Sequence, residues 1–369
     1  MLHSYAEKNT PFSLSPESLD WHLDRGWYRM GSTIFTTHFL FFNYQPYSAL
    51  WIRLQLQGFT FSKSQRRLLR KNAQLFDVAI GPRTIDGEHE RLYRRYADDF
   101  DGKLSPTISD SLEDYDGQSV FNTYEVTIRD RVSRQLVACS YFDLGDNSAA
   151  SILGIFDPKL RSFSLGYYTM LLEMEYCLTQ GFDYYYPGYV VPGYQRFDYK
   201  LRLGDAQYYD LRTGSWQPYT NIDVSREAPV EIQHRQLSGL CELLKREGFD
   251  TSVYIYPLFE AGLYDIWNDD YFPYPYLVPL SALSGKAMYV AAFDPRERHF
   301  YLLECKHMVQ TQLLFNADYL KSFDRGNFLT ELLAVSRVLY RSASTELTVK
   351  AAAILIKELM KRKMNSKRS

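Results

Sequence analysis

The sequence predicts an α/β (α+β) protein with more than one domain. The chain has 369 residues, which is more than one hydrophobic core usually spans, and 46% of them are apolar and 23% charged, as in ordinary globular proteins. The central region follows the order β-β-β-α-β. Its apolar runs lie at 123–128, 136–144 and 151–156, before a helical pattern at 164–180 and a last run at 184–191.

The region before this pattern is expected to contain two helices and several strands. A short helix is predicted at 14–25, because Ser15 is a suitable N-cap and Gly26 follows the last turn. The stretch 27–51 is rich in aromatic and β-branched residues, which favours strands or a buried extended segment. A second helix is predicted at 62–72.

Two stretches predict domain boundaries. Residues 97–116 carry seven carboxylates against one lysine, which indicates a linker or loop, and 216–229 is rich in Pro, Asn and Thr. We therefore expect three segments, at 1–115, 116–220 and 226–369.

The last of these segments is expected to be a C-terminal α/β accessory domain. Asp294-Pro295 predicts a hairpin turn between two of its strands. Its expected elements are a helix at 229–247, strands at 253–259, 288–293 and 300–305, and helices at 327–341 and 345–363.

The composition limits which nucleic-acid, membrane and metal-binding functions the sequence supports. The formal net charge of −2 gives no global basic field, so contact with nucleic acid requires a local basic patch. There is no secretory leader pattern and no run near about 18 apolar residues, which predicts a cytoplasmic protein that does not enter a membrane. The four cysteines are far apart in sequence and form no CxxC pair, so they do not indicate a zinc or iron–sulfur site. They are Cys139, Cys177, Cys241 and Cys305.

The segment 61–72 holds five basic residues and no acidic one. Four of them follow helical i, i+3, i+4 and i+7 spacing and form one basic stripe, which suits a nucleic-acid backbone. The same spacing also fits a solvated cationic helix face, which is what runs of charge usually form. The stripe consists of Lys63, Arg66, Arg67 and Arg70.

The segment 184–200 is a Tyr-rich strand interrupted by two Pro-Gly pairs. Such an interruption frees backbone groups and opens a cleft, although a twisted edge strand covered by tyrosines would give the same pattern. Side chains that could line the opening are Tyr189, Arg196, Tyr199 and Lys200.

These segments, with others in a fixed order, resemble the arginyl- and leucyl-tRNA-protein transferases over roughly residues 20–205. The order and spacing of the pieces carry the resemblance, because each piece alone is short. They are Arg25-Gly-Trp-Tyr-Arg-Met-Gly31, Phe61-Ser-Lys-Ser-Gln-Arg-Arg67, Val137-Ala-Cys-Ser-Tyr-Phe-Asp143, Phe156-Asp-Pro158, Ser164-Leu-Gly166 with Glu173 downstream, and Tyr186-Pro-Gly-Tyr189 before Tyr199-Lys200.

The resemblance implies a GNAT-like acyltransferase fold in two GNAT-like halves. It implies transfer of an amino acid, arginine or leucine, from aminoacyl-tRNA to the α-amine of proteins with Asp or Glu at the N-terminus, with DNA playing no part. It places Lys200, Tyr199 and Tyr189 at the catalytic centre. The residues it assigns to substrate or tRNA binding are Lys63, Ser64, Gln65, Arg66, Arg67, Arg70, Tyr141, Asp143, Ser164, Gly166, Tyr186, Gly188 and Arg196.

One family feature is missing. Many members carry a cysteine cluster in places matched here by the stretch 36–42, which has no cysteine and only a lone histidine, His38. We therefore predict that the protein uses no metal, no iron–sulfur cluster and no other cofactor.

Two other functions fit the same fold class. An acyl-CoA-dependent N-acyltransferase would need a glycine-rich pyrophosphate loop at a helix N-terminus. The corresponding segment, Arg161-Ser-Phe-Ser-Leu-Gly166, has one glycine. A non-enzymatic RNA- or protein-binding adaptor on the same scaffold is the second alternative.

Overall fold

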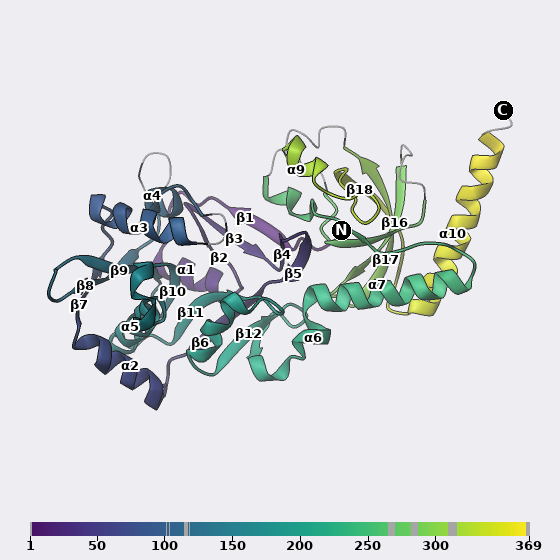
Figure 1. Cartoon of the computed structure of the whole chain (residues 1–369). Helices are drawn as coiled ribbons and strands as arrows, with labels where there is room; N and C mark the ends of the chain where they lie inside the picture. The colour runs from purple at the N-terminus through teal and green to yellow at the C-terminus, as the bar shows by residue number, and fades with distance from the viewer. Residues whose placement is uncertain are drawn as a thin grey trace.

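The computed structural model describes residues 2–100, 102, 104–113, 117, 119–264, 270–281, 287–308 and 316–366, with side chains as far as Lys361. The chain is a mixed α/β protein built around two large sheets (Figure 1). The larger sheet and its helices lie at the left of Figure 1, and the C-terminal sheet lies at the right.

The larger sheet has eight strands in the order β13-β12-β6-β11-β10-β9-β8-β7. All neighbours are antiparallel except β10 and β11, which run parallel around the intervening helix α5. The strands are β6 (Leu50–Gln55), β7 (Phe76–Pro82), β8 (Thr123–Asp130), β9 (Leu136–Leu144), β10 (Ser148–Phe156), β11 (Tyr184–Val190), β12 (Ala206–Asp210) and β13 (Ser215–Pro218).

Helices cover both faces of this sheet because its central strands are apolar on both sides. On β9, Ala138 and Phe142 pack in the cluster with α5, while Cys139 and Tyr141 pack in the cluster with α3 and α4. The helices are α2 (Lys63–Ala73), α3 (Gly87–Asp99), α4 (Ile108–Leu112) and α5 (Leu165–Gln180), with 3-10 turns η1 (Pro158–Phe163) and η2 (Gln195–Arg202).

The N-terminal segment packs over the middle of the large sheet, where Tyr28 and Ile34 share a hydrophobic cluster with Trp51, Ala150 and Tyr186. It contributes a three-stranded sheet in the order β1-β3-β2 and a separate hairpin of β4 and β5. The bounds are β1 (Ala6–Asn9), α1 (Pro16–Leu23), β2 (Tyr28–Met30), β3 (Thr33–Thr37), β4 (Phe39–Phe42) and β5 (Gln45–Ser48).

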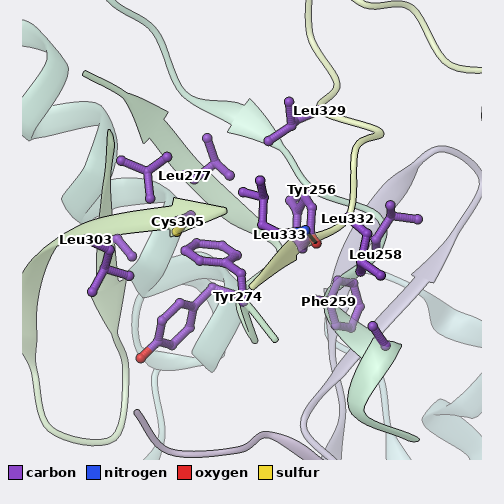
Figure 2. Close-up of a cluster of buried hydrophobic side chains, with 14 of the residues drawn as sticks. Tyr256, Leu258, Phe259, Tyr274, Leu277, Leu303, Cys305, Leu329, Leu332 and Leu333 are labelled. Carbon is purple, nitrogen blue, oxygen red and sulfur yellow. Dashed lines mark hydrogen bonds between the residues drawn. The ribbon is translucent and has the colours of Figure 1, made fainter. Parts of the chain in front are cut away.

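The C-terminal domain is a five-stranded sheet in the order β14-β15-β16-β17-β18. One face packs on α7 and α10, and the other buries a second cluster that includes Tyr256, Leu303 and Leu333 (Figure 2). Its elements are η3 (Tyr219–Asn221), α6 (Val224–Glu227), α7 (Pro229–Arg246), β14 (Tyr254–Ile255), η4 (Phe259–Tyr264), β15 (Tyr276–Pro279), β16 (Ala287–Asp294), β17 (His299–His307), α9 (Ala317–Lys321), β18 (Leu333–Ser342) and α10 (Thr345–Ser366).

Buried polar contacts tie the N-terminal segment to the C-terminal domain. Asp294 is fully buried and accepts hydrogen bonds from the hydroxyls of Tyr5 (2.7 Å) and Tyr274 (2.9 Å). Phe39 of β4 is part of the C-terminal core. The two regions therefore share one interior, and the N-terminal segment is anchored in the C-terminal domain.

Most predicted elements are confirmed, and two expectations are wrong. Residues 327–341 were expected to be helical, but they contain strand β18 instead. The segments 1–115 and 116–220 do not form two sheet-containing halves, since β6 pairs with β11 and β7 pairs with β8 across the expected boundary. In the described parts of the chain, no helix combines the length and apolar character needed to cross a membrane.

Candidate functional site

The centre of the large sheet opens into a fork. β10 and β11 pair at three positions only, from Ser148 with Tyr184 to Ala150 with Tyr186. Immediately beyond, β10 shifts register against β9 between Ser151 and Leu153, and β11 shifts against β6. A register shift bends its strand, so the two parallel strands diverge and leave backbone groups unpaired between them.

Tyr28 of β2 fills the apex of the fork. Its hydroxyl donates to the carbonyl oxygens of Ser151 on β10 and of Tyr186 on β11, the latter at 3.0 Å. The ring stacks on Trp51 with centroids 5.1 Å apart. Tyr28 therefore holds the two strands at a fixed separation where their own ladder has ended.

A pocket of about 770 Å³ lies in this fork. Its walls come from β2, β10, the first turn of α5, β11, η2 and the end of α3. The volume falls within the usual range for small-molecule sites. Seven of the predicted site residues line this pocket: Tyr189, Tyr199, Lys200, Ser164, Gly166, Gly188 and Arg196.

The N-terminus of α5 points its first turn at the pocket. Ser164 occupies the N-cap position in a left-handed conformation (φ 52°), and its side chain makes no capping hydrogen bond. Leu165 and Gly166 line the pocket directly. Uncapped N–H groups at a helix start, together with the helix dipole, favour an anion or a developing negative charge.

Lys200 contacts the bent part of β11. Its Nζ donates to the carbonyl oxygen of Tyr189 at 3.0 Å, and burial lowers the pKa of its ammonium to about 7. Gly188 has φ 95°, and a Cβ there would lie 3.1 Å from Nζ. The positive φ therefore favours glycine at this position, and a Cβ there would crowd the ammonium of Lys200.

The pocket walls carry five basic side chains and one carboxylate. Arg29 is neutralised by Asp143, and Arg161 by Asp99. Arg196 lies over the ring of Phe100 at 3.8 Å. Arg202 at the exposed rim and the ammonium form of Lys200 inside the pocket are suited to a carboxylate or phosphate.

Three predicted binding residues lie in the core, and we remove them from the site. Asp143 is fully buried and pairs with Arg29 at 2.7 Å, while burial keeps the pKa of its carboxyl raised. Tyr141 is fully buried and donates to the carbonyl oxygen of Thr84. Tyr186 is 3% exposed and packs in a hydrophobic cluster. None of these side chains can reach a ligand without leaving the interior.

The predicted basic stripe lies on α2 and is exposed, as is Ser64. Gln65 is buried instead and completes a capping box with Ser62. Its Nε2 also donates to the hydroxyl of Tyr167 (3.0 Å) and the carbonyl oxygen of Arg202 (3.1 Å), and both residues line the pocket. Gln65 therefore fixes the start of the basic helix beside the rim of the pocket.

Residue-by-residue prediction missed Tyr28 and Ser151. Tyr28 belongs to the segment 25–31 that carried part of the resemblance, so the signal was present without a role attached to it. Ser151 begins a predicted strand, and only the fork shows that it faces a pocket.

His38 and the four cysteines were the residues considered for metal binding. His38 is buried, which lowers its pKa to about 3 and keeps the ring neutral. Its ring stacks on Tyr209 with centroids 6.4 Å apart. Among the described residues, no three His, Cys, Asp or Glu side chains gather as a metal would need, and the cysteines at 139, 177, 241 and 305 are buried and free.

The fold and the pocket together define an α/β protein with one large site in the fork of its main sheet. A family profile described as "Arginine-tRNA-protein transferase, C terminus" matches residues 88–210. This range contains the fork, α5 and Lys200. The C-terminal domain lies outside it.

Curated relatives agree with this match. The chain is 31% identical to an aspartate/glutamate leucyltransferase of Helicobacter hepaticus over 192 residues, which cover 49% of this chain and 74% of the relative. It is 29% identical to the enzyme of that name from Ruegeria pomeroyi over 189 residues, covering 51% of this chain and 67% of the relative. The chain belongs to the family of aminoacyl-tRNA-protein transferases.

Coverage is lower for another relative and for solved structures. The Paracoccus denitrificans aspartate/glutamate leucyltransferase is matched over 63% of its length at 28% identity, by 45% of this chain. FemX is matched with a TM-score of 0.33 and 9% identity, over 52% of this chain and 65% of FemX. L-PGS from Bacillus licheniformis gives a TM-score of 0.30 and 9% identity, over 38% of this chain and 46% of that structure. Similarity this low does not define the fold.

Proposed function

We propose that this protein transfers leucine or arginine from aminoacyl-tRNA to the α-amine of proteins that begin with Asp or Glu. The observation that carries the proposal is the pocket in the fork, lined by Lys200, Arg202 and the first turn of α5, in a chain that belongs to the aminoacyl-tRNA-protein transferase family. We also propose that its sheet and α5 correspond to a GNAT-like acyltransferase fold. Relatives named aspartate/glutamate leucyltransferases support the acceptor class.

The reaction requires mainly that the two reactants are positioned together and that the developing negative charge is stabilised. The acceptor nitrogen attacks the carbonyl carbon of the aminoacyl ester, a C–N bond forms, and the C–O bond to the terminal ribose breaks. Overall one proton passes from the amine to the ribose oxygen. Because the ester is already activated, positioning the two reactants together supplies much of the rate.

The first turn of α5 suits the developing oxyanion. The helix begins without a side-chain cap, and its first residues, Leu165 and Gly166, line the pocket. Preorganised N–H donors contribute about 3–4 kcal/mol each to transition-state stability in acyl transfer. We therefore propose that the aminoacyl carbonyl binds beside the first turn of α5.

Lys200 suits the acidic side chain of the acceptor. With a pKa of about 7, its amine is only partly protonated at neutral pH in the empty pocket. A bound carboxylate stabilises the ammonium and raises that pKa again. Binding of an acidic N-terminus therefore takes up a proton, and peptide affinity falls as the pH rises above about 7.

The basic stripe on α2 suits the tRNA. Gln65 holds the helix start against Tyr167 and Arg202 at the pocket rim, so the stripe leads away from the place where the 3′ end would enter. Lys63, Arg66, Arg67 and Arg70 then contact phosphates of the acceptor stem.

The proposal is tested by transfer assays with labelled Leu-tRNA and Arg-tRNA and peptides that begin with Asp, Glu, Arg or Lys. We expect label on the Asp and Glu peptides, lost in Lys200→Ala and retained in Lys245→Ala, which removes an exposed lysine of α7. Absence of label from every acidic peptide with the wild-type protein would refute the proposal. Label taken from acetyl-CoA would instead indicate the acyl-CoA-dependent alternative, and tRNA binding without transfer would indicate the adaptor.

A further inference from the structure

A carboxyl group lies buried behind the pocket floor without a cationic partner. Glu173 of α5 is 0% exposed. Thr169, four residues earlier on the same helix face, lines the pocket together with Met170. Glu173 therefore lies one helical turn deeper than the pocket wall.

The partners of this carboxyl are hydroxyl groups. Tyr185 donates to Oε2 at 2.7 Å, whereas Oε1 has no directed hydrogen bond to any described residue. Burial raises the pKa of Glu173 to about 7, and the hydroxyls of Ser140, Tyr185 and Ser151 act in the opposite direction. By contrast, Asp143, a buried carboxylate of β9, has a guanidinium beside it.

A buried and unpaired carboxyl is costly to keep for packing alone. Desolvating it without a full set of hydrogen bonds opposes folding, and a hydrophobic residue of similar size would avoid this cost. Such groups are concentrated at functional sites, where a proton must be held near neutral pH.

The strand β10 packs against α5, and its residue Ser151 lines the pocket. The Ser151 hydroxyl is among the three that lower the pKa of Glu173. Ser151 is the first residue of β10 past the parallel pairing, at the point where the fork opens. Its backbone carbonyl is held by Tyr28, which fixes where the side chain begins.

The other titratable groups that face Glu173 stay protonated near neutrality. Tyr28 of β2, Tyr185 of β11, Tyr199 of η2 and Cys177 of α5 all have pKa values raised by burial and by the carboxylate. Among these groups, Glu173 is therefore the one whose protonation changes near pH 7.

We propose that Glu173 accepts, through the hydroxyl of Ser151, the proton that the acceptor amine loses as it attacks the aminoacyl ester. As the C–N bond forms, an amine proton passes to Ser151 Oγ while the hydroxyl proton of Ser151 passes to Glu173. As the C–O bond breaks, the same path returns a proton to the ribose oxygen, so Glu173 ends ionised. This inference rests on the proposed function, since it names the proton acceptor for that reaction.

The test is the pH dependence of single-turnover transfer at saturating peptide, for wild type, Glu173→Gln and Ser151→Ala. We expect the wild-type rate to rise through an inflection near pH 7. Both variants lose that inflection and about 10²–10⁴-fold in rate at neutral pH, the usual contribution of general acid–base catalysis. The matched control Glu175→Gln removes an exposed carboxylate of the same helix and keeps the wild-type profile.

The variant Tyr185→Phe distinguishes a catalytic from a purely structural role of Glu173, because only a catalytic role links this hydroxyl to the inflection pH of the transfer rate. Removing a hydroxyl that lowers the pKa of Glu173 shifts the inflection to higher pH while transfer continues. A folded Glu173→Gln variant with the wild-type inflection and a rate within threefold of wild type would overturn the inference. If Glu173→Gln does not fold, an unchanged profile in Ser151→Ala would overturn it equally. Failure of the wild-type protein to transfer any amino acid would instead refute the proposed function.

Discussion

Replacing Arg29 with methionine tests how the pocket wall is held. The Arg29 side chain is 1% exposed and its guanidinium donates to Asp143 and, at 2.8 Å, to Thr123. It also donates to the carbonyl oxygen of Leu112, which ties β2 to the segment after α3. The change keeps an unbranched, apolar chain but leaves Asp143 buried without its cation.

The expected cost follows from that burial. Removing one partner of a buried ion pair destabilises a protein by about 3–5 kcal/mol, because the other charge remains desolvated. For a unit of roughly 150–250 residues this corresponds to a loss of about 6–20 °C in melting temperature. The control Arg131→Met breaks an exposed pair with Asp77 and should cost less than about 1 kcal/mol.

The stability deficit of Arg29→Met should depend on pH. Without Arg29, the pKa of Asp143 rises further above its value in the unfolded chain, so the folded state binds the extra proton. The deficit of Arg29→Met therefore shrinks as the pH is lowered from 8 to 5, as measured by denaturant unfolding. A cost under 1 kcal/mol, or a deficit that grows toward low pH, would refute this reasoning. The double variant Arg29→Met with Asp143→Leu should recover most of the loss.

Three further predictions concern the site and its surroundings. Arg66→Ala with Arg67→Ala should weaken tRNA binding and lower the slope of log affinity against log salt by up to about 2, and an unchanged slope would mean that these residues contact no phosphate. Gly188→Ala and Gly193→Ala each replace a glycine at positive φ and should each cost about 1–2 kcal/mol of stability. Only the first places a Cβ against Lys200, so only it should reduce transfer strongly, and equal transfer rates in the two variants would contradict this. Tyr5→Phe removes a hydrogen bond to buried Asp294 and should lower the free energy of unfolding by about 1.5–3 kcal/mol, measured by thermal unfolding. An unchanged melting temperature would mean that the N-terminal strand is dispensable for docking.

The elements that local signals specify were predictable. The helix at 164–180 has an apolar pattern and a glycine stop, and α5 ends at Gly181 in the left-handed conformation. The strands that precede it and the strand that follows it were also expected from their apolar runs. These features depend on neighbours in sequence.

Elements that depend on distant pairing were not predictable. Leu329, Leu332 and Leu333 follow helical spacing, yet β18 forms because residues 333–342 pair with β17. The expected boundary near residue 115 failed for the same reason, since β6 joins the sheet beside β11. Tertiary pairing overrides local preference in both cases.

The site divides in a similar way. Lys200, Tyr199 and Tyr189 were expected from an interrupted strand and its following turn, and the structure brings all three to one pocket. Tyr28 and Ser151 meet across 123 positions of sequence, so no local pattern could pair them. Burial of Asp143 and Tyr141 was equally hidden, because both stand in a strand whose two faces are covered.

We propose that the fork between β10 and β11 holds the aminoacyl group during transfer. A crystal structure of the full chain with a hydrolysis-resistant amide analogue of 3′-aminoacyl-adenosine would locate this group. We expect the carbonyl carbon between Ser151 and Gly188, below the first turn of α5. The analogue bound elsewhere, for example in the pocket of about 320 Å³ between β12 and the C-terminal domain beside His38, would contradict the claim.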